Sequence, residues 1–196
     1  MKVKKIGALC RAAGTCLLYD EVSETGEIKR QWISNGAALW PVSGLPPLRE
    51  ANLSTLFDFT PQQTEKICIK ETELPQHLCG VLYDARDGED ELQESTMRIT
   101  VDGVTLMAMT VGGSVKWLRA EELKPCWTSQ TQLVRRRTEK GDVIAVLDGL
   151  FLSGIVFSRL LPPEHYRELL RLGASAPAPV VRPEEPDREP EGDDAD

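Results

Sequence analysis

The side chains able to act as nucleophiles, bases or metal ligands are few in this chain and widely spaced. Its two histidines, His77 and His165, have no partner at the spacing of a zinc-binding helix. The five cysteines contain no C-x-x-C pair, and Cys10 and Cys16 straddle the end of an expected helix, where buried thiols act as small hydrophobic groups. The sequence also lacks a glycine-rich phosphate loop. We therefore expect no enzymatic activity, no metal site and no cofactor.

Cysteine usage and apolar content also predict where the protein works. An odd number of scattered cysteines argues against a secreted disulfide framework and favours the reducing cytoplasm. The lysine-rich start is followed by an amphipathic run, so we expect no signal peptide. The most apolar window, Val143–Leu161, contains Asp148 and Gly149 and indicates two strands around a turn. We expect no membrane segment.

Charged side chains are the remaining candidates for function. Residues 84–94 carry six acids against the single Arg86, and Arg135 and Arg137 share one face of an expected strand. These residues could contact a partner protein or phosphate groups. A solvated loop and a charge-protected edge strand explain the same pattern, so both interpretations stay open. The candidate partner-binding residues are Asp84, Asp87, Glu89, Asp90, Glu91, Glu94, Arg135 and Arg137.

The elements that must position these residues form an α+β fold of short helices packed on antiparallel β-meanders. Its central feature is the hairpin 31–42, in which Trp32 and Trp40 flank an Asn35-Gly36 turn with positive φ values. Helices are predicted over 3–13 and 48–57 and from Pro162, with helical turns at 60–63 and 120–124. Further strands are predicted at 15–20, 66–71, 78–83, 115–118 and 131–137, and hairpins with Asp-Gly turns are predicted at 99–110 and 144–152.

The length favours one main domain followed by a different kind of segment. We expect a single α+β domain over residues 1–172, with subdomains 1–83 and 96–172 joined by the acidic loop as an open alternative. Residues 173–196 hold five prolines and a net charge of −6, which predicts a disordered acidic tail. The whole chain has a net charge of −8, so the body is nearly neutral.

Six segments of the N-terminal third form a recognisable pattern. The segments are Leu9-Cys10-Arg11-Ala12, Leu18-Tyr19-Asp20, Gln31-Trp32-Ile33-Ser34-Asn35-Gly36, Trp40-Pro41-Val42, Gly44-Leu45-Pro46-Pro47-Leu48 and Leu56-Phe57-Asp58. They resemble a family of small proteins carried by phages and mobile elements of gut Firmicutes. Some proteins of this kind are similar to anti-CRISPR proteins, which inhibit the type II effector nuclease. The resemblance covers the rest of the chain only in outline.

The resemblance implies a phage-encoded inhibitor that works by protein–protein contact in the cytoplasm of a bacterial host. Its partner would be the type II CRISPR effector nuclease, alone or with its guide RNA. Such an inhibitor needs a surface complementary to a basic channel or a mobile nuclease domain. The acidic loop and the acidic tail are the candidates for that surface. The nearly neutral body favours trapping of a conformation over mimicry of DNA.

Two other classes of protein remain open from the sequence. Short helices between three-stranded meanders look like a divergent domain of a DNA sliding clamp, which would be a phage replication accessory with Arg135 and Arg137 lining a channel. A structural protein of the virion or mobile element is the third class. Direct nucleic-acid binding and homo-oligomerisation are also left open.

Overall fold

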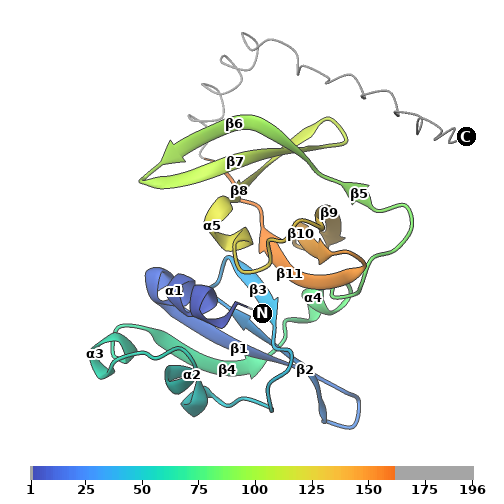
Figure 1. Cartoon of the computed structure of the whole chain (residues 1–196). Coiled ribbons are helices and arrows are strands. Elements are labelled where there is room, and N and C mark those ends of the chain that lie inside the picture. Colours follow the sequence, from blue (N-terminus) through green and yellow to red (C-terminus); the bar gives the residue numbers. More distant parts are fainter. Residues whose placement is uncertain (1, 162–196) are drawn as a thin grey trace, which may run out of the picture. The chain divides into compact units, whose positions relative to one another are not determined.

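A computed structural model describes residues 2–161 and places them in two β-sheets with short helices (Figure 1). The larger sheet has the strand order β4-β1-β2-β3-β11-β10-β9-β5, and the smaller sheet has the order β6-β7-β8. The predicted α+β class is confirmed. The expected helix from Pro162 and the expected tail over 173–196 lie outside the described residues.

The elements of the N-terminal half are α1 Val3–Ala13, β1 Thr15–Val22, β2 Ile28–Ser34, β3 Ala38–Pro41, α2 Glu50–Leu56, α3 Pro61–Thr64, β4 Cys68–Glu73 and α4 Gln76–Cys79. Those of the C-terminal half are β5 Asp90–Glu91, β6 Gln93–Val101, β7 Val104–Val111, β8 Ser114–Arg119, α5 Ala120–Leu123, β9 Thr131–Thr138, β10 Gly141–Asp148 and β11 Phe151–Phe157. Apart from the parallel pair β1–β4, neighbouring strands pair antiparallel.

Helix α1 begins and ends where the sequence predicts. Its apolar residues Ile6 and Cys10 are four positions apart and both are buried, so one face of the helix lies against the core. The amide of Gly14, at a φ of 65°, donates to the carbonyl oxygens of Arg11 and Cys10 and ends the helix in a left-handed cap. Strand β1 follows directly and buries Cys16 in the same core.

The hairpin β2–β3 buries its two tryptophans on opposite faces of the larger sheet. Trp40 packs with Ile33 in one hydrophobic cluster, and Trp32 packs with Leu39 in the other. Both indole side chains are almost completely buried, at 0% exposed for Trp32 and 1% for Trp40. A sheet with apolar residues on both faces cannot lie at the surface, so the rest of the chain must cover each face.

The turn of this hairpin differs from the predicted one. Gly36 takes a positive φ of 84°, but Asn35 does not, so the prediction of positive values at both residues is wrong. The Oδ1 atom of Asn35 instead accepts hydrogen bonds from the amides of Ala37 and Ala38, at 3.0 and 2.9 Å. The side chain thereby replaces the cross-strand hydrogen bond of a two-residue turn.

The two halves of the chain meet where β3 pairs with β11. Leu39 lies opposite Ile155 and Ala38 opposite Val156, and the amide of Phe157 donates to the carbonyl oxygen of Ala37 at 3.0 Å. Backbone contacts group Met1–Leu160 as one compact unit. The larger sheet is therefore continuous through both halves.

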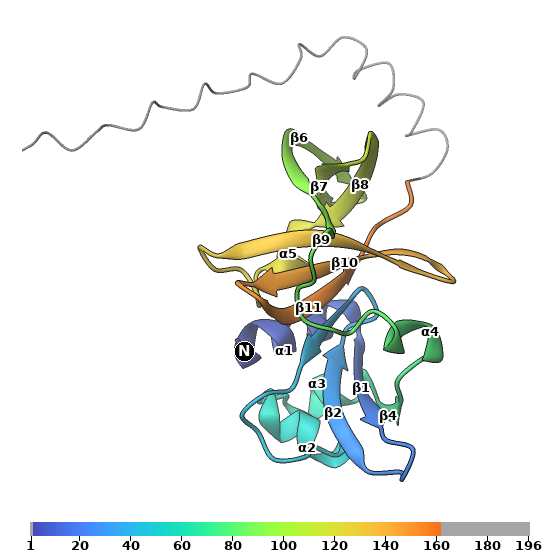
Figure 2. The same cartoon turned by 90° about the vertical axis from the view of Figure 1, so that its right-hand side faces the viewer.

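The smaller sheet adds to one of the two cores. Its first hairpin turns on Asp102 and Gly103, which both take positive φ values of 50° and 76°, as an Asp-Gly turn predicts. Met107 and Leu118 pack with Leu123 of α5 in the cluster that also contains Trp40. Figures 1 and 2 show α5 between the smaller sheet and the larger one.

Three predictions for the connecting segments need correction. Strand β4 pairs parallel to β1, so the larger sheet is not a pure meander. Helix α2 begins at Glu50 and ends at Leu56, so it is shorter than the helix predicted over 48–57. The strand predicted over 78–83 does not form: α4 ends at Cys79, and the carbonyl groups of Val81 and Tyr83 bind an arginine side chain instead of a neighbouring strand.

Replacing Gly154 by alanine should destabilise the junction of the two halves. A Cβ there would lie 2.9 Å from the Sγ of Cys126 and 3.0 Å from the carbonyl oxygen of Leu39. We expect Gly154→Ala to lower the free energy of unfolding in urea by about 1–3 kcal/mol. The control is Gly80→Ala, because Gly80 has a φ of −74° and open space around its Cα. Equal stability of the two variants would contradict the close packing at β11.

Candidate partner-binding surface

Residues Asp84–Glu94, here called the acidic strap, run along the outer edge of β9. Within the strap, β5 pairs antiparallel with β9, so that Asp90 lies opposite Arg135 and Glu91 opposite Val134. Asp90 and Glu91 therefore form the eighth strand of the larger sheet where a loop was predicted, although both side chains remain exposed. Two regions predicted separately as partner-binding, the strap and the arginine-rich strand, bind each other.

Arg136 is the centre of this attachment. Its side chain is 1% exposed, and its guanidinium donates to the backbone carbonyl oxygens of Val81, Tyr83 and Asp84. Its Nε and Nη2 atoms also donate to the two carboxylate oxygens of Glu89, at 2.7 and 3.1 Å. A guanidinium has five N–H groups in a fixed plane, which suits such a set of acceptors. The strap is thus held by a buried, fully paired cation.

The ion pairs shift the pKa values of the strap carboxylates. Burial alone would raise the pKa of Glu89, but hydrogen bonds from Arg136 and from the amide of Arg86 outweigh it and leave this pKa below its ordinary value. A hydrogen bond from Arg135 lowers the pKa of Asp90. Because both pKa values are lower in the folded protein, the pairs stabilise it above the ordinary carboxyl pKa of about 4. That stabilisation is lost as the pH falls through the lowered values.

The other predicted site residues occupy different environments. The Oδ1 of Asp84 accepts a hydrogen bond from the amide of Leu152 at 2.9 Å. Glu94 lies at the start of β6, in the smaller sheet, and pairs with Arg98 at 3.1 Å. The predicted site residues that are exposed and make no ion pair within residues 2–161 are Asp84, Asp87, Glu91 and Arg137.

The sequence-based prediction did not include Arg136, because it considered only the face of the strand that carries Arg135 and Arg137. Arg135 and Arg137 do alternate with Arg136 along β9, as predicted. The missed signal was charge balance: six acids in one segment and three consecutive arginines in another neutralise each other best in contact.

Beside the strap, the turn between β10 and β11 exposes two large apolar side chains. Leu150 is 73% exposed and Phe151 is 70% exposed. We call these two residues the apolar tip. Its backbone is fixed from the side of the strap, because the amide of Ala85 donates to the carbonyl oxygen of Leu150 at 2.8 Å. Strap and tip therefore form one continuous, ordered surface.

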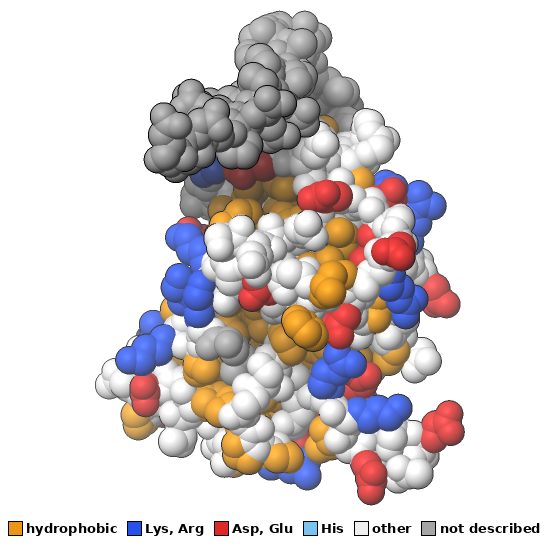
Figure 3. Space-filling model, turned by 45° about the vertical axis from the view of Figure 1, so that its right-hand side comes forward, with side chains coloured by type: hydrophobic (Ala, Val, Ile, Leu, Met, Phe, Trp, Pro, Cys, Tyr) orange, Lys and Arg blue, Asp and Glu red, His pale blue; other side chains and the backbone are white. Residues whose placement is uncertain are grey.

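A cavity of about 260 Å³ opens next to the tip. Phe151 and Asp148 line it, together with Thr128, Lys2 and Trp40. The hydroxyl of Thr128 donates to the Oδ1 of Asp148 at 2.6 Å, which holds the turn in place. Figure 3 shows hydrophobic side chains reaching the surface between acidic and basic groups on one face of the molecule.

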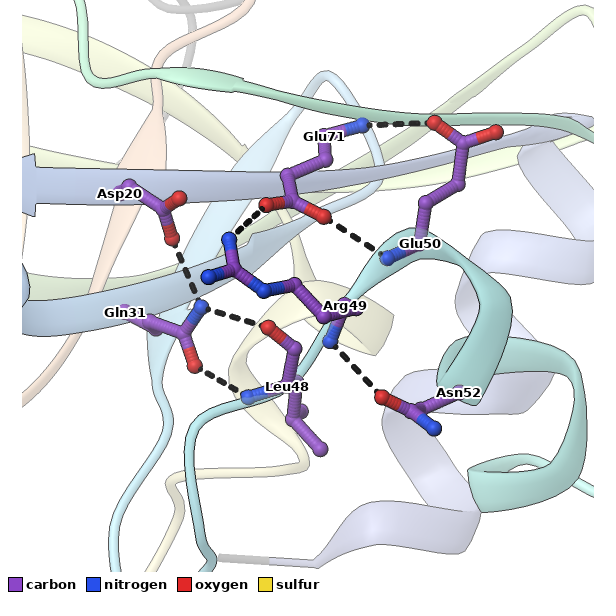
Figure 4. Close-up of polar contacts among 7 residues, drawn as sticks. All are labelled: Asp20, Gln31, Leu48, Arg49, Glu50, Asn52 and Glu71. Atoms are coloured by element: carbon purple, nitrogen blue, oxygen red, sulfur yellow. Dashed lines mark hydrogen bonds and ion pairs between the residues drawn. The ribbon is translucent and has the colours of Figure 1, made fainter.

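A second polar cluster lies at the opposite edge of the larger sheet and has a structural role (Figure 4). The amide group of Gln31 donates to Asp20 and to the carbonyl oxygen of Leu48, and its Oε1 accepts from the amide of Leu48. Glu50 and Glu71 each accept a hydrogen bond from the backbone amide of the other. These contacts fasten α2 and the preceding loop to the edge strand β4.

Within residues 2–161, His, Cys, Asp and Glu side chains form no group that could hold a metal ion. Each helix in this range is too short or too polar to cross a membrane. Cys10 and Cys16 are buried, as expected. Cys126 is buried as well, whereas Cys68 and Cys79 are exposed. Comparison of the chain with protein-family models, with curated proteins and with solved structures finds no match.

One buried carboxylate lies outside these clusters. Glu122 of α5 is 0% exposed, and its oxygens accept no hydrogen bond within the described part of the chain. The nearest cations are Arg159 at 3.6 Å and Arg119 at 4.0 Å. Burial raises the pKa of Glu122, and the two arginines only partly oppose this effect. Because this pKa is higher in the folded protein, stability falls as the pH rises through the ordinary glutamate pKa.

Replacing Arg136 by alanine should loosen the strap and destabilise the fold. The change leaves Glu89 and three carbonyl oxygens without their buried partner. We expect Arg136→Ala to lower the free energy of unfolding by about 3–5 kcal/mol, measured by urea denaturation. Arg137→Ala, at the exposed neighbouring position, should change it by less than about 0.5 kcal/mol. Similar losses in both variants would show that the strap does not depend on Arg136.

Replacing Glu122 by glutamine should stabilise the protein at neutral pH. The change removes a buried charge whose oxygens lack hydrogen bonds, so we expect a gain of about 1–2 kcal/mol at pH 7. The gain should shrink towards zero below about pH 4, where a glutamate is protonated in the unfolded chain as well. Glu121→Gln, at an exposed position, should have little effect. Thermal unfolding of the three proteins at both pH values tests this, and a pH-independent difference would contradict it.

Proposed function

We propose that this chain is a non-enzymatic protein that binds and inhibits a type II RNA-guided DNA nuclease by protein–protein contact. One observation carries the proposal: Arg135 and Arg136 fix the acidic strap in place while Asp87 and Glu91 remain exposed, and the amide of Ala85 links the strap to the apolar tip. A surface ordered before binding loses less conformational entropy when a partner docks.

The chemistry of this surface suits a basic partner with an apolar depression. A nuclease that holds a guide–target heteroduplex has a positively charged channel, and carboxylates attract such a channel over several ångströms. Leu150 and Phe151 would supply buried anchors, which contribute most of the affinity of a typical interface. The ion-paired Glu89 and Asp90 serve mainly to hold the strap, so the contact rests on the exposed acids.

The identity of the partner comes from the resemblance of the N-terminal third to phage and mobile-element proteins. Three residues of the resembling segments, Asp20, Gln31 and Leu48, belong to the structural cluster of Figure 4. The resemblance therefore concerns residues that hold the fold together, and the proposed contact surface lies elsewhere.

A sliding-clamp-like DNA accessory is the second candidate. One feature favours it: a helix followed by a three-stranded meander occurs twice, as α1-β1-β2-β3 and α5-β9-β10-β11, and the two meanders join edge to edge through β3 and β11. The ion pair of Arg135 with Asp90 weakens the role proposed for this arginine in a DNA channel. A ring-sized mass in solution, with retention on circular but not linear DNA, would support this candidate.

The proposed inhibition is tested by DNA cleavage with a purified type II effector nuclease and its guide RNA. We expect the wild-type protein to block cleavage, and the combined variant Asp87→Asn with Glu91→Gln to need at least about tenfold more protein for the same effect. Phe151→Ser should weaken binding by a similar or larger factor. Undiminished cleavage at saturating wild-type protein would reject the proposed function.

A charge-matched control separates a local contact from an effect of net charge. Glu24 and Glu27 are exposed acids in the turn between β1 and β2, away from the strap in sequence and in the sheet. Glu24→Gln combined with Glu27→Gln should leave inhibition unchanged. If this control weakens inhibition as much as the strap variant does, the strap is not the contact surface.

A further inference from the structure

Helix α1 exposes a face that carries only positive charge. Lys4, Lys5 and Arg11 are exposed, and the alanines at positions 8 and 12 lie between them at the surface. The helix contains no acidic residue. Within residues 2–161, none of its cations takes part in an ion pair. Ion pairs do engage nine other cations: Arg30, Arg49, Arg98, Lys116, Arg119, Lys124, Arg135, Arg136 and Arg159.

The two lysines of this face work against the stability of the helix, whereas Arg11, in the last turn, favours it. Lys4 and Lys5 lie in the first turn, where the positive end of the helix dipole favours aspartate or glutamate. Lys2, at the N-cap, makes no side-chain hydrogen bond to the helix and donates instead to the carbonyl oxygen of Trp127 at 2.8 Å. Solvated helix faces commonly mix acids and bases at spacings of three or four residues, which stabilises them. The face of α1 lacks that compensation in a chain of net charge −8.

We propose that the exposed face of α1 binds the phosphate backbone of a nucleic acid. Lys4 and Arg11 are seven residues apart, which is about 10 Å along the helix axis and equals about three phosphate intervals of one strand along a duplex. The short side chains of Ala8 and Ala12 let the helix approach a strand closely. Contacts to phosphate oxygens carry no sequence information directly, so the proposed binding is independent of sequence. The inference does not depend on the proposed nuclease inhibition.

The test measures binding of the full chain to three probes of 20 nucleotides or base pairs: duplex DNA, duplex RNA and single-stranded DNA. Dissociation constants are determined between 50 and 200 mM salt. We compare the wild type with a variant carrying Lys4→Gln, Lys5→Gln and Arg11→Gln. The variant should bind at least about tenfold more weakly at 50 mM salt. For a duplex, the plot of log affinity against log salt concentration has a negative slope. The magnitude of this slope should decrease by about 2.7, the value for three lost phosphate contacts.

The control removes three exposed cations from elsewhere, by Lys29→Gln, Lys70→Gln and Lys140→Gln. These lysines make no ion pair within the described residues. The control should bind like the wild type. Circular dichroism should show both variants folded, because glutamine is a good helix former in α1 and the three control positions are exposed. The single change Lys4→Gln should reduce the magnitude of the duplex slope by about 0.9.

Three outcomes would overturn the proposal. The first is no binding of the wild type to any probe at 50 mM salt. The second is equal weakening in the α1 variant and in the control, because only total charge would then matter. The third is binding of an acidic polypeptide, polyglutamate, with no binding of the nucleic acids, because the face would then fit an acidic protein. The order of affinity among the three probes identifies the form of nucleic acid that α1 prefers.

Discussion

Burial of the larger sheet on both faces is the constraint on which the rest of this structure depends. Trp32 and Trp40 come from one hairpin, yet each lies in a different core. Each core therefore needs its own cover: α1, α2 and the smaller sheet contribute to the core around Trp40, and α4 with the segment that follows it contributes to the core around Trp32. The four-residue strand β3 makes this possible because it pairs with both β2 and β11.

A sheet with two open edges invites pairing with other chains, and here charged side chains close both edges. At the β4 edge, Glu50 accepts the hydrogen bond of the exposed amide of Glu71, and Arg49 pairs with the carboxylate of Glu71. At the β9 edge, the acidic strap adds a two-residue strand and Arg136 holds the chain beyond it. Burial of apolar side chains thus stabilises the sheet, while ion pairs and hydrogen bonds of charged side chains cover its two edges.

The sequence could predict the elements whose signals are local. The cap at Gly14, the capping box of Thr60 with Gln63 and the Asp102-Gly103 turn all form, because each depends on neighbouring residues alone. The parallel pairing of β4 could not be predicted, since it depends on how α2 and α3 carry the chain back along β1. The segment at 78–83 was expected to be a strand from its composition, but its carbonyl groups bind Arg136, which lies more than fifty residues further along the chain.

The candidate site shows the same division between local and distant information. Charge runs located the acidic strap and the arginine strand correctly, but only the fold shows that they neutralise each other. Once these pairs are accounted for, the apolar tip and the cations of α1 are two surface features that folding does not explain. An exposed phenylalanine in a turn and lysines at the positive end of a helix both oppose stability. Both features oppose stability and yet are held in ordered positions. Binding to a partner offers a physical reason for features of this kind.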